Sequence, residues 1–207
     1  MDRQPPRDEP VLLFRIMNKK RVKIDLNAPA VRGFSAICLA VTALGIMSGG
    51  RITWRYFMTY RSSLLDPMTY FRAFSYVFGH SGWDHFFGNV SYILLLGPML
   101  EEKYGSRRIV QVIAATALVT SVVNAVFFPG SGISGASGVV FAFILLTSFT
   151  EFRAGEIPIT FLLVAGIYIG KELVAALTVI DSVSQLGHIL GGITGAVIGY
   201  SLNRKGR

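Results

Sequence analysis

The sequence predicts an all-α membrane protein with six transmembrane helices and with both chain ends on the inner side of the membrane. Composition is the first observation behind this prediction. The 207-residue chain is 52% hydrophobic and only 15% charged, whereas soluble domains carry about 25% charged residues. The second observation is that charges almost vanish from long stretches, as expected for segments that lie in lipid. The mean hydropathy of +0.52 agrees with both.

Six apolar segments, each of about 15 to 20 residues, are long enough to span or partly span a bilayer. In chain order they cover 31–49, 85–100, 109–128, 136–150, 157–176 and 185–202. The second and fourth are short, which a span tolerates when one end is surrounded by protein rather than lipid. The expected organisation is a basic cytoplasmic segment at 1–28, a membrane domain at 29–203 and a basic cytoplasmic tail at 204–207.

The distribution of Lys and Arg sets the orientation, because positive residues accumulate on the cytoplasmic side of a membrane. With the N-terminus inside, fifteen of the 20 basic residues fall inside, and the five outside are Arg51, Arg55, Arg61, Arg72 and Lys171. The net charge of +8 therefore reflects topology. Binding to nucleic acid is not expected, because no basic helix or aromatic stacking platform accompanies the charge.

Polar side chains gather at the expected outer ends of the second, fourth and sixth segments. His85 and Asn89 lie at the start of the second, Ser137 at the start of the fourth and His188 at the start of the sixth. Ionisable residues in membrane segments are costly, so their presence indicates a functional site. His85 and Asn89 are four residues apart and share one helix face. Their N–H groups suit a site where negative charge develops on oxygen.

The stretch "GISGASG" at 132–138 offers two candidate nucleophiles, Ser134 and Ser137. Ser137 leads directly into an apolar run and is expected at a helix N-terminus, where free backbone N–H groups and the helix dipole favour an anion. A serine needs a neighbouring base before it can attack, and His188 can supply one. Glycines recur at every fourth residue after His188 and would let the sixth segment approach the fourth closely; they are Gly191, Gly195 and Gly199.

Each of these motifs also has an ordinary structural interpretation. Serine is a common helix N-cap, a membrane histidine often bridges helices, and regularly spaced glycines usually serve packing. The conjunction is less ordinary, because all three histidines of the chain, His80, His85 and His188, fall on the same side. A zinc site is not expected, since His80 and His85 are poorly spaced for one helix face and no carboxylate or cysteine joins them. No metal or other cofactor is therefore predicted.

Taken together, the motifs resemble those of the rhomboid intramembrane serine proteases over residues 71–200. The stretch "FRAFSYVFGHSGWDHFFGN" resembles the first-loop and second-helix motif of that family, with Phe71 and Arg72 in the place of its Trp-Arg pair. "LEEKYGS" resembles the Glu-x-x-x-Gly motif and aligns Glu101 with Gly105. "GASGVVFA" resembles the nucleophile motif, and "GHILGGITG" the His-x-x-Gly-x-x-x-Gly motif of the sixth helix.

The resemblance implies roles for individual residues. Ser137 would be the nucleophile and His188 its base, with His85 and Asn89 on the oxyanion side. The supporting positions that it implies are His80, Arg72, Glu101, Phe141, Gly135, Gly138, Gly191 and Gly195. Two positions depart from the family pattern: Phe141 stands where many relatives have tyrosine, and Phe71 where tryptophan is usual. Trp54-Arg55 also reads Trp-Arg, but its distance from His80 along the chain does not fit.

The expected activity is hydrolysis of peptide bonds in or near transmembrane segments of other membrane proteins by a Ser137–His188 dyad. The expected partners are transmembrane-helix substrates and the lipid bilayer, and the sequence does not indicate an oligomeric state. Water would enter from the outer side, through the loops at 51–84 and 171–184. The expected location is a prokaryotic plasma membrane, with the site open to the outer side.

Two other functions remain open at this stage. One is a catalytically silent rhomboid-like protein that binds membrane proteins, although such a binder has no need of Ser137 and His188. The other is a small transporter, which would require discontinuous helices and charges at the membrane midplane. The middle positions of these segments are apolar or glycine.

Overall fold

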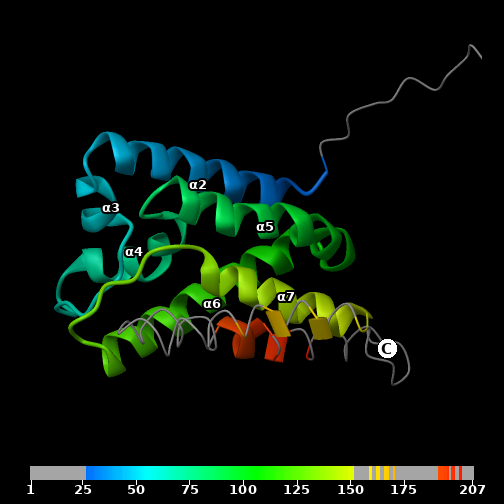
Figure 1. Ribbon diagram of the computed structural model, residues 1–207. Coiled ribbons are helices and arrows are strands. Elements are labelled where there is room, and N and C mark those ends of the chain that lie inside the picture. The colour runs from blue at the N-terminus through cyan, green and yellow to red at the C-terminus, as the bar shows by residue number, and fades with distance from the viewer. Residues whose placement is uncertain are drawn as a thin grey trace, which may run out of the picture.

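The computed structural model describes residues 27–151 and parts of the chain beyond them, namely 159, 162–163, 166–167, 170, 191–195, 197–198 and 201. Within this described part the protein is helical, and no β-strand occurs there. The long helices are α2 (Pro29–Met47), α5 (Trp83–Tyr104), α6 (Ser106–Phe127) and α7 (Ser137–Glu151). Figure 1 shows them packed together, with short helices gathered at one end.

Four of the six apolar segments predicted from the sequence coincide with these long helices. Segments 31–49, 85–100, 109–128 and 136–150 lie on α2, α5, α6 and α7. Two of the helices, α2 and α6, are long and apolar enough to cross a membrane, and α7 carries a shorter apolar stretch, Ser137–Thr147. Segments 157–176 and 185–202 lie largely outside the described residues, as do nearly all of 1–28 and all of 204–207.

The region at 51–84, treated as a loop in the sequence analysis, contains three short helical elements. They are α3 (Arg51–Tyr56), α4 (Pro67–Ser75) and the 3-10 turn η1 (Tyr76–Phe78). The start of α4 has a local cause, because the Asp66 side chain accepts a hydrogen bond of 2.9 Å from the Met68 N–H and Pro67 suits the first helical position. Elements this short give too weak a periodic signal to be read from sequence.

Helix α5 lies at the centre and packs against α2, α6 and α7. Its Gly97 allows a close approach to both α2 and α7, since a Cβ atom there would lie 2.6 Å from a Val31 methyl of α2 and 3.3 Å from the Phe143 ring of α7. Small residues at such crossings let membrane helices pack tightly. The core around this contact is apolar and includes Val31, Ile93, Ile109 and Phe143, all at most 1% exposed.

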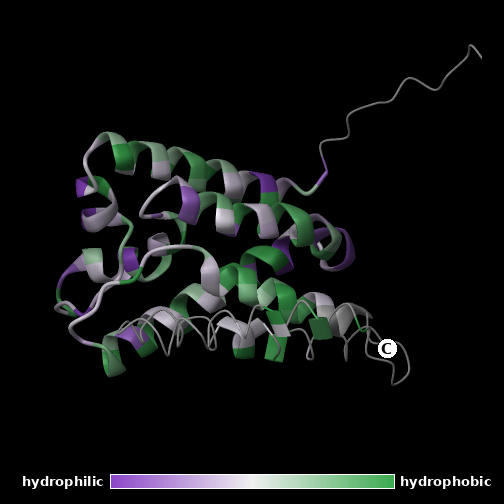
Figure 2. Cartoon of the chain, in the orientation of Figure 1, coloured by the Kyte–Doolittle hydropathy of each residue, from purple (hydrophilic) through white to green (hydrophobic). Residues whose placement is uncertain are grey.

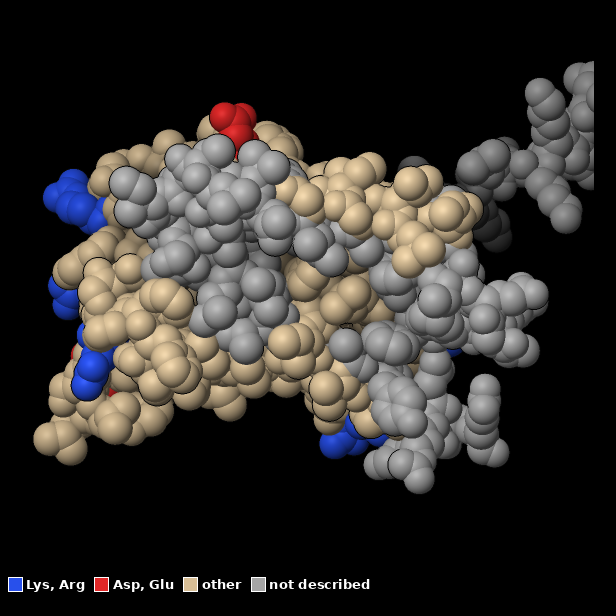
Figure 3. Space-filling view, turned by 60° about the horizontal axis from the view of Figure 1, so that its bottom comes forward, with Lys and Arg blue, Asp and Glu red and all other residues tan. Residues whose placement is uncertain are grey.

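The surface of the long helices is apolar as well. Figure 2 shows hydrophobic residues prevailing along these helices, whereas hydrophilic ones gather around α3 and toward the helix ends. On the face shown in Figure 3, the described Lys and Arg side chains lie at the margins, and the described atoms between them belong to other residue types. Exposed apolar side chains along the helices include Leu39, Leu44, Leu94, Leu95, Val110 and Val122. This distribution fits a protein whose helices face lipid.

Glu101 joins three helices at the end of the bundle opposite α3 and α4. Its carboxylate accepts hydrogen bonds from the backbone N–H groups of Ala30 and Val31, both at 2.9 Å, and from the Ser106 hydroxyl at 2.6 Å. The first N–H groups of a helix have no partner within the helix. Glu101 thus satisfies two of those of α2, and its negative charge also complements the dipole of that helix.

Candidate active site

The connection at 128–136, which precedes the predicted nucleophile and is here called the nucleophile loop, passes directly against the predicted oxyanion residues. A Cβ atom on Gly135 would lie 2.7 Å from His85 Nε2 and 3.6 Å from Asn89 Nδ2. The φ angle of Gly135 is +119°, a conformation that favours glycine. The Gly135 N–H also donates a 2.9 Å hydrogen bond to the Tyr76 carbonyl. Both the close approach and the backbone angle therefore require glycine at this position.

His85 and Asn89 present nitrogen atoms to this loop from successive turns of α5. Ser81 Oγ lies 3.2 Å from His85 Nδ1, so the other ring nitrogen, Nε2, is the one beside Gly135. Asn89 is 7% exposed, and its Nδ2 has no hydrogen-bond partner among the described residues. A buried amide without a partner is costly. Its N–H groups are therefore available to an atom that enters the site.

The two candidate serines have different surroundings. Ser137 is the first residue of α7, so the backbone N–H groups of the first helical turn lie next to it. Ser134 precedes Gly135 and instead lines a pocket of about 240 Å³ together with Trp54, Met58, His80 and Ser81. The helix N-terminus and its dipole are thus associated with Ser137, as the sequence analysis expects.

Three described glycines of the sixth segment pack against the first turns of α7. A Cβ atom on Gly191 would overlap the carbonyl of Gly138, and one on Gly195 would lie 2.6 Å from the Ala142 Cα. Between them, Gly192 lies against the Phe141 ring. His188 lies outside the described residues, three positions before Gly191. The structure therefore brings together Gly135, His85, Asn89 and the start of α7, and places residues 191–195 along that helix.

Comparison with known proteins now adds to this geometry. A family model described as the rhomboid domain matches residues 67–205. The chain belongs to the rhomboid family. It is 32% identical over 138 residues to rhomboid-related protein 1 of Caenorhabditis elegans, which covers 62% of this chain and 39% of that protein. It is 31% identical over 160 residues to rhomboid-related protein 2 of Mus musculus, covering 67% and 53%. The match thus spans about two fifths of one relative and about half of the other.

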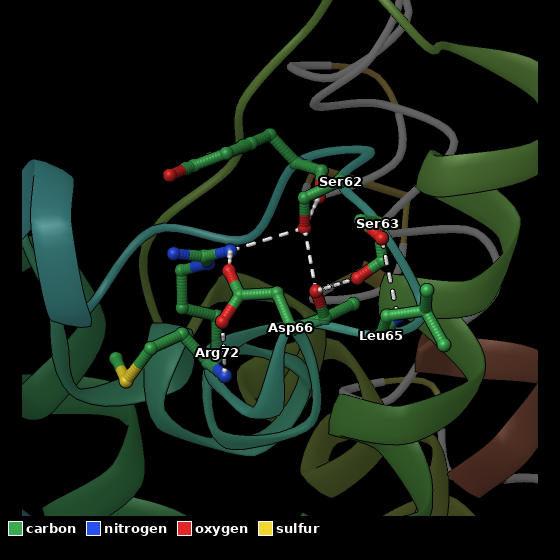
Figure 4. A network of polar contacts seen from close by, with 8 residues as sticks. Ser62, Ser63, Leu65, Asp66 and Arg72 are labelled. Atoms are coloured by element: carbon green, nitrogen blue, oxygen red, sulfur yellow. Dashed lines mark hydrogen bonds and ion pairs between the residues drawn. The ribbon is translucent and has the colours of Figure 1, made fainter.

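Arg72 organises the first loop of this rhomboid chain. It is 5% exposed, and its guanidinium donates to Ser62 Oγ at 3.0 Å and to Asp66 Oδ2 at 3.4 Å. Figure 4 shows Arg72 pointing toward both side chains. The guanidinium also lies over the Tyr60 ring, 4.4 Å from its centre. Phe71, by contrast, is 49% exposed. Of the pair Phe71 and Arg72, it is therefore Arg72 that holds the loop.

His80 is enclosed behind His85. It is 2% exposed, and its Nδ1 donates to the Phe78 carbonyl at 3.2 Å, while its ring centre lies 5.0 Å from that of His85. Burial, together with the positive charge that His85 can carry, lowers the pKa of His80 to about 4. His80 is therefore neutral at pH 7. In the part of the chain that the structure describes, no group of three or more His, Cys, Asp or Glu could hold a metal ion.

Three buried residues that hold the nucleophile loop were not singled out from the sequence: Thr59, Ser121 and Asn124. Asn124 donates to the Ser131 carbonyl at 3.0 Å, and Ser121 Oγ lies 2.7 Å from Thr59 Oγ1. The available signal was the presence of polar residues near the end of the apolar segment 109–128. That signal does not name their partners.

Proposed function

We propose that this rhomboid chain is an intramembrane serine endopeptidase in which Ser137 is the nucleophile and His188 its base. The observation that carries the proposal is the approach of Gly135, two residues before Ser137, to His85 and Asn89. It brings two side-chain nitrogens close to the start of α7, where the N–H groups of the first helical turn point out of the helix end. A hydrolase stabilises an oxyanion with donors arranged in this way.

The assignment of His188 is supported by packing and chain length. Gly191 packs against Gly138, the residue after Ser137. His188 precedes Gly191 by three residues, and three residues of extended chain reach about 10–11 Å, so this contact is compatible with His188 acting as a base beside Ser137. A neutral imidazole there can accept the serine proton.

The proposed reaction begins when Ser137 Oγ bonds to the substrate carbonyl carbon and His188 accepts the hydroxyl proton. The carbonyl oxygen becomes an oxyanion that accepts hydrogen bonds from His85, Asn89 and the N-terminal N–H groups of α7. Collapse of this intermediate breaks the C–N bond, and His188 gives its proton to the leaving amine. Water then attacks the acyl ester along the same path and restores Ser137.

The proposed substrates are transmembrane helices of other proteins. Such helices keep their peptide bonds in internal hydrogen bonds, so a segment must unwind locally before Ser137 can reach it. Substrates with glycine, proline or other weak helix formers should therefore be cut preferentially. The pocket of about 240 Å³ beside Ser134 supports entry of water from the loops at this end of the molecule.

The proposed topology has six transmembrane helices, with the N- and C-termini in the cytoplasm and the site open to the outer side. The asymmetric distribution of Lys and Arg supports it. The proposal of a prokaryotic plasma membrane is based on the compact core, whereas both relatives named above are animal proteins. Reporter fusions at each end of the chain, expressed in a bacterium, test the orientation.

The test is cleavage of a transmembrane substrate in liposomes by the wild type and by the variants Ser137→Ala, Ser134→Ala and His188→Ala. We expect Ser137→Ala and His188→Ala to lose at least about 10³-fold in kcat, as in other serine hydrolases, and Ser134→Ala to stay close to the wild type. Loss in Ser134→Ala alone would make that serine the nucleophile. A folded wild type that neither cleaves nor reacts with a fluorophosphonate probe would instead support the silent binder.

A further inference from the structure

The stretch 131–135, which leads to Ser137, is held at alternate residues. The Ser131 carbonyl accepts a hydrogen bond from Asn124 Nδ2 at 3.0 Å. Ile133 exchanges two backbone hydrogen bonds of 2.9 Å with Thr59, forming an isolated antiparallel bridge. The Gly135 N–H donates to the carbonyl of Tyr76 in η1. Three separate contacts therefore hold this stretch, one at every second residue.

Two of these contacts lead back to the last turns of α6. Asn124 makes its contact directly, whereas Ser121 acts through Thr59, whose Oγ1 lies 2.7 Å from Ser121 Oγ. Ser121 and Asn124 are three residues apart and therefore lie on one face of the helix. They are 5% and 3% exposed, and Thr59 is 3% exposed. Buried polar contacts of this kind are made in a low dielectric and restrict the position of both partners.

We propose that Thr59, Ser121 and Asn124 are positioning residues that set the place of Ser137 relative to His85 and Asn89. The inference builds on the proposed function, because positioning matters only if Ser137 reacts. From Gly135, which lies against His85, only one residue intervenes before Ser137. A shift of the held stretch is therefore passed to the nucleophile, and a displacement of about 1 Å can cost about 100-fold in rate.

Helix α6 also provides a matched control for this proposal. Thr116 is fully buried on the same helix, and its Oγ1 has no hydrogen-bond partner among the described residues. Thr116→Val and Thr59→Val both replace a buried hydroxyl by a methyl group of similar size. Only Thr59→Val removes a contact, the one to Ser121, that fixes the residue whose backbone pairs with Ile133 of the nucleophile loop. If Thr59 has a positioning role, the reaction slows in Thr59→Val and not in Thr116→Val.

The experiment compares the full-length wild type with Thr59→Val, Ser121→Ala, the double variant and Thr116→Val in liposomes. It measures kcat and KM on a transmembrane substrate, the rate of fluorophosphonate labelling of Ser137, and Tm. We expect each single variant to lower kcat and labelling by about 5- to 30-fold, with KM changed less than about twofold, since the loss falls on the reacting geometry. The double variant should be no slower than the slower single variant, because both remove one contact. Ser121→Thr, which keeps the hydroxyl, should restore the rate.

Amide hydrogen exchange of residues 131–137 is the second measurement, and it does not depend on activity. Faster exchange in Thr59→Val than in Thr116→Val is expected. The inference would be overturned if Thr59→Val and Ser121→Ala kept the kcat and labelling rate of the wild type. It would also be overturned if Thr116→Val lost as much kcat and labelling as they do, in proportion to a lowered Tm. If the wild type is inactive but amide exchange is faster in Thr59→Val than in Thr116→Val, the proposed function is refuted, whereas the restraint of the loop by Thr59 is supported. Exchange of residues 131–137 that is unchanged in Thr59→Val would refute that restraint.

Discussion

The two ends of the helix bundle solve the same physical problem in different ways. At one end, here called the Glu101 end, α5 and α6 are joined by the single residue Gly105, and one carboxylate satisfies the start of α2. At the other, here called the site end, the chain leaves the helices at 57–66 and 128–136. There, buried side chains such as Asn124 and Arg72 fix these non-helical segments through individual hydrogen bonds.

The difference shows where irregular backbone has been retained. Backbone polar groups outside helices are expensive near a membrane unless each finds a partner. The Glu101 end avoids that cost by a short connection. The site end bears it, and this is where Gly135, His85 and the start of α7 meet. Within the described residues, this cost falls mainly at the site end, as expected when irregular backbone serves function.

The comparison predicts that activity and stability can be separated, and Gly135→Ala should give the largest effect. The added Cβ would lie 2.7 Å from the His85 ring, and the φ angle of +119° is strained for alanine. We expect kcat to fall by more than about 100-fold, because the loop must move away from His85 and Asn89. Cleavage of a transmembrane substrate, normalised to folded protein, measures it.

Gly130→Ala is the matched control for this substitution. Gly130 lies in the same connection, but a Cβ atom there would have no neighbour within 4 Å. Its kcat should therefore stay close to that of the wild type. Equal activity of the two variants would show that the close approach at Gly135 has no role in the reaction.

The helices and part of the site could be predicted from sequence because their signals are local. Apolar segments gave α2, α5, α6 and α7, and the four-residue spacing placed His85 and Asn89 on one face. The hold on the nucleophile loop could not be predicted, because Thr59 and Ser121 are 62 positions apart. Thr116 also shows why a buried hydroxyl alone is not a sufficient signal, since it lies on the same helix without such a contact.

At the Glu101 end we expect stability to fall while activity is unchanged, which is the opposite of the result expected for Gly135→Ala. The effect should be of intermediate size. Glu101→Gln keeps the shape of the side chain but removes its charge and one acceptor oxygen, so one of the two N–H groups of α2 loses its partner. Hydrogen bonds to charged groups contribute about 1.5–3 kcal/mol each. We therefore expect the free energy of unfolding to fall by about 1–3 kcal/mol, with kcat per folded molecule unchanged. Reversible unfolding in mixed micelles provides the measurement, and a loss of kcat without a loss of stability would contradict the distinction between the two ends.

The effect that is smallest at neutral pH is a dependence of stability on pH that originates at the site end. Burial lowers the pKa of His80 to about 4, below its ordinary value of 6.5. The unfolded chain therefore binds a proton between pH 6.5 and pH 4 that the folded chain does not. Stability from this group is complete above about pH 6.5 and is lost progressively as the pH falls toward 4. Thermal unfolding from pH 8 to pH 4 should show this decline.

His80→Gln isolates the contribution of that residue, because the carboxylates of the chain titrate in the wild type and the variant alike. Glutamine can still donate to the Phe78 carbonyl that His80 Nδ1 now bonds, but it does not titrate. The Tm difference between the two proteins should therefore shift in favour of the variant as the pH falls below 6.5. A difference that stays constant down to pH 4 would mean that His80 takes up its proton in the folded state. The site end would then hold a second buried positive charge, next to His85, in addition to that of Arg72.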